Sequence, residues 1–294
     1  MKLFFQVNYH TEWGENLFIT GAQEALGGGD IDKAIPMTLS DGDTWTAAIE
    51  LPDSLYLVTY SYIVRHDNGT VRREWGRAHR FERRPDTKNI RIIDRWQDQP
   101  CDKPYYSSAF TDCINYRGEH DKLVEAEPGY LTLAVDAPMI NADEAVAVSG
   151  EDEALGSWDT SKAARMSDAE YPTWKINIPL SGIKNGSDYK FLIIKKATGD
   201  IVAWEGRDNR TFHLPAIDEN ISVIDAGQRL VNSKNAWRGA GVAIPVFSLR
   251  SDEDFGVGDF MDIKKMVDWA VQTHQNFVQV LPINDTTMTH TWTD

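Results

Sequence analysis

Three tryptophans in the middle of the chain are the residues whose type and spacing best suit ligand binding. Trp158, Trp174 and Trp204 stand at turns or strand ends of Val148–Leu214, where apolar residues alternate between Gly, Pro, Asn and Asp. That pattern predicts short antiparallel strands of a β-sandwich, which buries its apolar residues between two sheets. Three indoles exceed what one small core needs. An indole at a loop tip offers a flat apolar face and one N–H donor, and the C–H face of a glucose ring can stack on it.

The elements that position these tryptophans resemble the starch-binding domain found in glucoamylases and related amylolytic enzymes. The similarity runs in order through L-G-x-W (Leu155–Trp158), Y-K-F (Tyr189–Phe191) and W-E…N-R (Trp204–Arg210). Each piece is weak by itself, but the ordered set is specific. The resemblance implies a mainly β fold, an antiparallel sandwich of the immunoglobulin-like kind.

The same resemblance implies two sites for α-glucans and maltooligosaccharides. The main platform would consist of two indoles and three polar partners, Trp158, Trp204, Lys190, Glu205 and Asn209. A second, separate site would use Trp174 with Tyr171. The alternative is that the tryptophans are buried residues of the sandwich. It applies more to Trp174 than to Trp204, because Trp204 precedes a polar run.

Residues 3–97 repeat the plan of the central stretch. Five pairs share an offset of 129 positions: Gly21/Gly150, Leu26/Leu155, Trp45/Trp174, Tyr62/Phe191 and Trp75/Trp204. The last predicted strands agree as well, Asn89–Asp94 against Asn220–Asp225. Self-similarity at this period means two copies of one domain and not a solenoid of small units.

The first copy departs from the pattern at its main platform. Three positions are changed: Trp158 falls in the run Gly27–Gly29, Lys190 becomes Ser61 and Asn209 becomes His79. Only Trp75 is then expected to remain there. A single ring without an opposing ring or a matching polar group should bind glucan poorly.

The second site is better kept in the first copy. Trp13-Gly14-Glu15-Asn16 is similar to the aromatic-Gly-Glu-Asn sequence of the family, and Trp13 would pair with Trp45. In the second copy the matching position lies near Ala142, so its second site is expected to be half lost. The two copies are therefore predicted to have kept opposite sites.

Composition and charge exclude several classes of partner. The 294 residues carry a formal net charge of −15, with a pI near 4.9, which argues against nucleic acid or an anionic membrane. The N-terminus turns polar after five residues, so no signal peptide is expected, and no run reaches transmembrane length. Two cysteines, Cys101 and Cys113, favour reduced thiols in a cytoplasmic protein. No metal or phosphate-loop motif occurs, and no cofactor is expected.

The C-terminal part changes to a different pattern. Gly241–Val246 is a short apolar run that suits a buried parallel strand, and Phe277–Leu281 is another. Between them apolar residues follow a helical period from Phe260, and Asp259 can cap that helix at its N-terminus. These elements predict one βαβ unit.

This part resembles the start of the catalytic domain of the amylomaltase and disproportionating-enzyme family of 4-α-glucanotransferases. The resemblance lies in A-G-V-A-I-P-V-F-S-L-R (Ala240–Arg250), G-V-G-D-F (Gly256–Phe260) and Q-V-L-P-I-N-D-T (Gln279–Thr286). It implies a (β/α)₈ barrel, which needs about 250 residues, whereas about 59 remain from Ala236 to Asp294. We therefore expect a truncated barrel and assign no catalytic residue. Even Asp285, in the turn after the second strand, would have no partner, so the chain alone is expected to be inactive.

The domain organisation follows from these patterns. We predict a first starch-binding sandwich at 1–97, a connecting segment packed on a domain at 98–128, a second sandwich at 129–226 and the start of the barrel at 227–294. The function that the resemblance implies is α-glucan binding within a retaining 4-α-glucanotransferase, which works through two carboxyl groups. The alternative is a non-catalytic starch- or glycogen-binding protein. The oligomeric state is left open.

Overall fold

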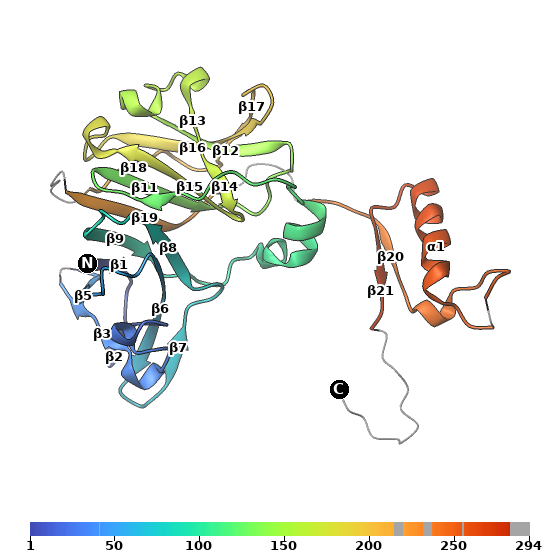
Figure 1. The fold of residues 1–294 in the computed structure, drawn as a ribbon, viewed down its shortest axis with the longest axis horizontal. Helices are drawn as coiled ribbons and strands as arrows, with labels where there is room; N and C mark the ends of the chain where they lie inside the picture. The colour runs from blue at the N-terminus through green and yellow to red at the C-terminus, as the bar shows by residue number, and fades with distance from the viewer. Residues whose placement is uncertain (41, 215–219, 232–236, 255, 283–294) are drawn as a thin grey trace. The chain divides into compact units, whose positions relative to one another are not determined.

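The computed structural model describes residues 1–40, 42–214, 220–231, 237–254 and 256–282. The chain divides into two compact units, residues 1–234 and residues 235–294. The first unit contains both predicted sandwiches and the segment that connects them (Figure 1). Each unit is described by itself.

The first copy is built from short strands whose buried residues alternate, as the sequence pattern predicts. In β1 the pattern is regular, with Leu3, Phe5 and Val7 buried. The elements are β1 (Lys2–Asn8), β2 (Glu15–Gly21), η1 (Glu24–Leu26), η2 (Ile31–Lys33), β3 (Ile35–Pro36), β4 (Thr38–Leu39), β5 (Thr44–Glu50), β6 (Leu57–His66), β7 (Val71–Arg73), β8 (His79–Arg83) and β9 (Asn89–Arg95).

The second copy repeats this order of elements. They are β11 (Tyr130–Asp136), β12 (Glu144–Gly150), η5 (Glu153–Leu155), η6 (Thr160–Lys162), β13 (Ala164–Arg165), β14 (Ser167–Glu170), β15 (Thr173–Pro179), η7 (Leu180–Gly182), β16 (Asp188–Lys195), β17 (Ile201–Trp204), β18 (Arg210–Thr211) and β19 (Ile221–Arg229). The last strand runs to Arg229, three residues beyond the predicted end of the domain.

The connecting segment contacts both copies. It contains η3 (Lys103–Tyr106), the π-helical turn η4 (Ala109–Ile114) and β10 (Glu125–Ala126). Strand β10 pairs in parallel with β8 of the first copy, and Ala126 lies in the first core. Further along the segment, Arg117 is buried against the second copy, where it pairs with Asp168. Cys101 and Cys113 are free and exposed.

The two copies share one eight-stranded sheet, which the sequence pattern did not predict. Its order is β14-β15-β11-β19-β9-β1-β5-β4, and the copies join where β9 and β19 run parallel. In that pairing Ile90 is opposite Ser222 and Ile92 is opposite Ile224. The last strand of each copy would otherwise be an exposed edge, and pairing the two edges removes both.

The two sandwiches lie on opposite faces of the shared sheet. Ile92 and Ile224, which are neighbours across β9 and β19, both contribute to the first core. Adjacent residues of a strand point to opposite faces, so Val223 lies in the second core and Ile93 packs against it. Figure 1 shows the resulting layers, with β16 and β12 on one side of the shared sheet and β6 and β2 on the other.

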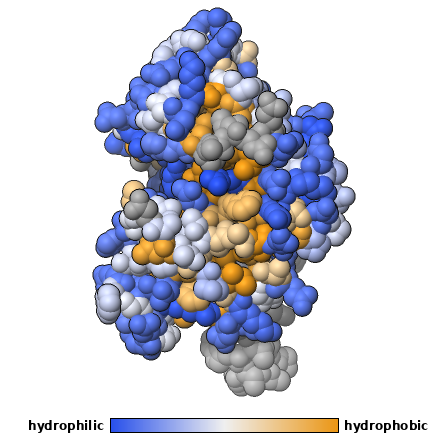
Figure 2. Space-filling view, turned by 90° about the vertical axis from the view of Figure 1, so that its left-hand side faces the viewer, coloured by the Kyte–Doolittle hydropathy of each residue, from blue (hydrophilic) through white to orange (hydrophobic). Residues whose placement is uncertain are grey.

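Charged and polar residues cover most of the face shown in Figure 2. Apolar side chains gather in the middle of that face, with hydrophilic side chains around them. None of the described helices is long and apolar enough to cross a membrane.

The second unit is the predicted βαβ arrangement. Strands β20 (Gly241–Ile244) and β21 (Phe277–Val280) run parallel, and α1 (Phe260–Gln272) connects them after the short η8 (Val246–Ser248). Asp259 caps α1 as predicted: its side chain accepts from the Met261 N–H at 2.7 Å, and Asp262 accepts from the Asp259 N–H at 2.9 Å. The predicted turn residue Asp285 lies outside the described residues. The fold class is confirmed: mainly β, with the start of an α/β unit.

Candidate functional site

The two indoles of the predicted main platform lie together in the second copy. The ring centroids of Trp158 and Trp204 are 6.4 Å apart, with the ring planes inclined by 53°. Both side chains are half-buried, so each packs on the domain and keeps part of its surface in solvent. The structure therefore brings together two residues that are 46 positions apart in the chain.

A tight turn after η5 places Trp158. Ser157 and Trp158 have positive φ values of 50° and 62°, which residues with a bulky side chain seldom adopt. Two backbone hydrogen bonds hold this turn, from the Ser157 N–H to Asp152 O at 3.1 Å and from the Trp158 N–H to Gly150 O at 2.8 Å. Unusual backbone held by its surroundings is common at binding sites.

The predicted polar partners of the platform fall into two groups. Lys190 is half-exposed on β16, whose Leu192 is opposite Trp204, and Asn209 is exposed in the loop after β17. Both are available to hydroxyl groups of a ligand. Glu205 is different, because it is 3 % exposed and both of its oxygens accept from Arg210, at 2.9 and 2.8 Å. Glu205 therefore stabilises the loop and does not face a ligand, which corrects its predicted role.

Arg117 of the connecting segment occupies the predicted second site of the second copy. Trp174 is fully buried, and its ring N–H donates to Ala137 O at 3.2 Å. Tyr171 is half-buried and its hydroxyl donates to Pro138 O. The guanidinium of Arg117 lies 4.6 Å from the ring centroid of Trp174 and 5.1 Å from that of Tyr171. A sugar has no access to Trp174, so the prediction of a platform there is wrong.

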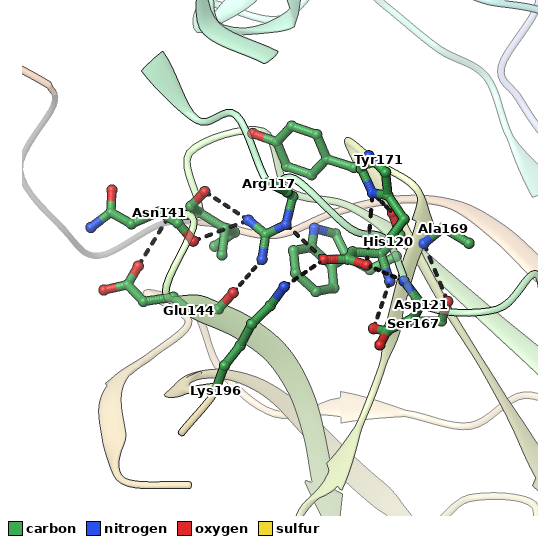
Figure 3. A network of polar contacts seen from close by, with 12 residues as sticks. Arg117, His120, Asp121, Asn141, Glu144, Ser167, Ala169, Tyr171 and Lys196 are labelled. Atoms are coloured by element: carbon green, nitrogen blue, oxygen red, sulfur yellow. Dashed lines mark hydrogen bonds and ion pairs between the residues drawn. The ribbon is translucent and has the colours of Figure 1, made fainter. Parts of the chain in front are cut away.

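A buried polar network fixes Arg117 in this position (Figure 3). Arg117 donates to Asp168 Oδ2 at 2.7 Å and to the carbonyls of Ile140 at 3.1 Å, Asn141 at 3.0 Å and Glu144. Burial opposes the negative charge of Asp168. Hydrogen bonds from the Asp121 N–H, Lys196 and Arg117 outweigh it and hold the pKa of Asp168 below its usual range.

The first copy presents only one of its two predicted second-site indoles. Trp13 is 98 % exposed in the turn before β2, next to Gly14 with a φ of 84°. Trp45 is 4 % exposed, and its ring N–H donates to Tyr9 O at 3.2 Å. Trp45 is therefore a core residue, as Trp174 is in the second copy, and the predicted Trp13–Trp45 pair is not formed.

Strand pairing corrects the match between Trp75 and Trp204. In the second copy Trp204 pairs with Leu192, which stands twelve positions earlier in the chain. In the first copy Ile63 corresponds to Leu192 and pairs with Arg73, which stands only ten positions later. The hairpin of the second copy is two residues longer. The counterpart of Trp204 is thus Arg73, so the first copy keeps neither ring of the main platform. The spacing of 131 between Asn89 and Asn220 was the available signal of this insertion.

Trp75 belongs to a different environment. It is half-buried, its ring meets the ring of Tyr106 edge-on at 5.3 Å, and the Arg229 guanidinium lies 5.8 Å from its centroid. Sequence reasoning also missed an aromatic pair of the first copy, Tyr9 and Trp96, with ring centroids 4.7 Å apart. Neither arrangement has a local motif, because each joins distant segments.

His79 is the centre of a buried charged cluster in the first copy. Its ring nitrogens lie 3.1 Å from Glu74 and 3.6 Å from Asp94, and Asp94 also accepts from the hydroxyls of Tyr60 and Tyr62 at 2.7 and 2.8 Å. Burial alone lowers the pKa of His79, but Asp94 and Glu74 outweigh it and raise the pKa to about 9. The group is therefore protonated at neutral pH.

We expect the stability of the first unit to fall as pH rises from about 6.5 to about 9. Below 6.5 the unfolded and folded states both hold the His79 proton, so its contribution is complete; above 9 it is lost. The shift corresponds to about 3 kcal/mol. Urea unfolding at pH 6.5 and pH 9.5 measures the fall, with His79→Gln as the control that does not titrate. An equal fall in both proteins would contradict this assignment.

Comparison with known proteins decides the family. The starch binding domain family matches residues 1–90 and 131–223, which is more than half of the chain. The chain belongs to the starch binding domain family. The two matched stretches coincide with the two copies on either side of the shared sheet. A second family, 4-alpha-glucanotransferase, matches residues 244–293.

The chain is also similar to individual proteins and to solved structures. A 4-alpha-glucanotransferase of Oryza sativa subsp. japonica is 31 % identical over 315 residues, which cover all of this chain and 32 % of the relative. A 4-alpha-glucanotransferase of Chlamydia trachomatis is 32 % identical over 75 residues, 25 % of this chain and 14 % of the relative. The chain spans about a third of the rice relative. A solved family 20 module of a maltotetraose-forming amylase from Pseudomonas saccharophila is 22 % identical over 33 % of this chain and 99 % of that one, with a TM-score of 0.27.

Proposed function

We propose that this chain is the α-glucan-binding region of a 4-α-glucanotransferase and binds mainly through Trp158 and Trp204. The observation that carries the proposal is this pair of partly exposed indoles, inclined by 53° to each other, on a starch-binding domain. Successive rings of an α-1,4-glucan are turned relative to one another, so two inclined faces suit them better than two coplanar ones. Lys190 and Asn209 supply a cation and an amide for the hydroxyls.

Calorimetric titration with β-cyclodextrin tests this proposal. The ligand presents an α-1,4-linked curve without free ends, and cellohexaose, with β-1,4 links, is the matched control. We expect saturable binding of the cyclodextrin with quenching of tryptophan fluorescence, and no binding of cellohexaose. Absence of cyclodextrin binding, or equal binding of both sugars, would overturn the proposal.

The activity of the longer protein is part of the same proposal. The similarity to glucanotransferases in the second unit supports transfer of α-1,4-glucanyl groups and favours it over a purely binding role. Retention of configuration would need two carboxyl groups about 5–5.5 Å apart. Free and exposed Cys101 and Cys113 support a cytoplasmic location, and the net charge of −15 supports a neutral sugar over nucleic acid as partner.

We further propose that this chain alone does not transfer glucosyl groups. In a (β/α) barrel the reacting groups come from the ends of several strands, and the described part of the second unit contains β20 and β21 only. Incubation with maltotriose, followed by chromatography of the products, should show neither glucose nor longer oligosaccharides. Turnover that co-purifies with the chain and disappears in Asp285→Ala would contradict this expectation.

We propose that the first copy contributes to the binding of large glucans through Trp13 alone. The ring is 98 % exposed, so it can reach a glucan surface without any change in the fold. When a glucan is long enough to span both contacts, binding at one of them raises the local concentration of glucan at the other. Trp13→Ala should therefore reduce adsorption to granular starch several-fold and leave the affinity for β-cyclodextrin unchanged. Equal losses on both ligands would argue against this role.

A further inference from the structure

A cavity of about 540 Å³ lies beside the shared sheet, between the two starch-binding domains. One wall is the face of β11 and β15 that points away from the second core, with Asp136 and Thr173. The opposite wall is Trp75 and the start of β8, and Tyr106 of the connecting segment adds a further side. Cavities of this size are typical of small-molecule sites.

The arrangement of the two domains explains why the cavity exists. Because the sandwiches lie on opposite faces of the shared sheet, no second sheet covers this face of β11 and β15. The flank of the first domain stands against it instead. Arg80 pairs with Glu170 at 2.9 Å, Lys175 pairs with Glu170, and Lys175 donates to Arg80 O at 3.2 Å. These contacts tie the two domains together at the cavity.

A row of three polar side chains crosses the first wall. Asp136 is opposite Thr173 on one side and opposite Arg229 on the other, on three neighbouring strands. Thr173 donates to Asp136 Oδ1 at 2.6 Å. Nε of Arg229 is buried and has no hydrogen-bond partner among the residues that the structure describes. Burial raises the pKa of Asp136, while Thr173, Arg229 and His79 act in the opposite direction.

The aromatic side chains supply the complementary surface. The rings of Trp75 and Tyr106 meet edge-on, with their centroids 5.3 Å apart. The Arg229 guanidinium lies 5.8 Å from the centroid of the Trp75 ring. A flat ring and a carboxylate are groups with which proteins hold a sugar: apolar stacking below and hydroxyl contacts at the edge. The opposed charges of Asp136 and Arg229 favour a neutral ligand over an anion or a cation.

We propose that this cavity binds a short neutral sugar, a glucosyl or maltosyl end, with Trp75 and Asp136 as its main contacts. The kind of sugar rests on the proposed function, but the residues are separate from Trp158 and Trp204. A sugar held there contacts both domains and the connecting segment. It stabilises the joined arrangement by RT ln(1 + [L]/Kd), which grows with the sugar concentration. β-Cyclodextrin, a closed ring without ends, does not enter, so the two sites have different ligands.

The test uses the chain with Trp158→Ala and Trp204→Ala, which removes the main platform. Calorimetric titration with maltose should show one remaining saturable site. Adding Trp75→Ala or Asp136→Asn should weaken that binding at least tenfold, whereas Tyr116→Ala, an aromatic residue of the same connecting segment that is 65 % exposed, should not change it. Asp136→Asn keeps the side-chain volume, so it decides the question if Trp75→Ala fails to fold.

The outcomes separate this proposal from the proposed function. Cyclodextrin binding by the unchanged chain, together with no maltose binding after loss of the platform, would overturn the cavity site alone. Remaining maltose binding that survives both Trp75→Ala and Asp136→Asn would also overturn it. If the unchanged chain did not bind cyclodextrin, the proposed function would be overturned instead.

Discussion

Replacing Trp158 and Trp204 together by alanine is expected to weaken β-cyclodextrin binding by a hundredfold or more. Stacking of a flat ring on an aromatic side chain contributes about 1–3 kcal/mol, by analogy with nucleic acid bases. Each single substitution should therefore cost about tenfold, and the two rings, 6.4 Å apart, contact the same ligand. Calorimetric titration of the single and double variants measures the losses.

The structure supplies the controls for this experiment. Both indoles are half-buried, so circular dichroism and urea unfolding should first show that each variant keeps its fold. Tyr56→Ala removes an aromatic residue that is 54 % exposed in the first copy and should leave cyclodextrin affinity unchanged. A double variant that keeps wild-type affinity with a native spectrum would refute the Trp158–Trp204 platform.

Arg117→Ala is expected to lower the free energy of unfolding of the first unit by roughly 3 kcal/mol. The substitution leaves the buried Asp168 without its closest charge partner, and breaking a buried ion pair from one side costs about 3–5 kcal/mol. The value lies at the lower end because Lys196 also pairs with Asp168, at 2.8 Å. Urea unfolding measures the change.

Arg165→Ala is the matched control for this prediction. Arg165 also pairs with a carboxylate, Asp121, at 2.9 Å, but its side chain is 41 % exposed, whereas that of Arg117 is fully buried. Exposed pairs contribute about 0–1 kcal/mol. If both alanine variants lost the same stability, the connecting segment would not be anchored by Arg117 as the structure indicates.

Local sequence patterns were enough to determine most of the elements and the duplication, and they brought the proposed Trp158–Trp204 platform into view. Alternation of buried residues in strands such as β1 follows from the two-residue period of a strand, which is a property of neighbouring residues. The cap at Asp259 is likewise local, since donor and acceptor lie within one turn of helix. Trp158 and Trp204 could be identified because their ordered motifs belong to a known domain.

Only the tertiary structure decided which tryptophans are available and how the copies are joined. Trp174 and Trp204 both stand at strand ends, yet one is fully buried and the other is half-exposed, because burial depends on what packs against a residue. The guanidinium over Trp174 comes from Arg117, 57 positions earlier in the chain. Pairing of β9 with β19 joins strands more than a hundred residues apart. Such contacts are non-local, so no period or spacing within either copy encodes them.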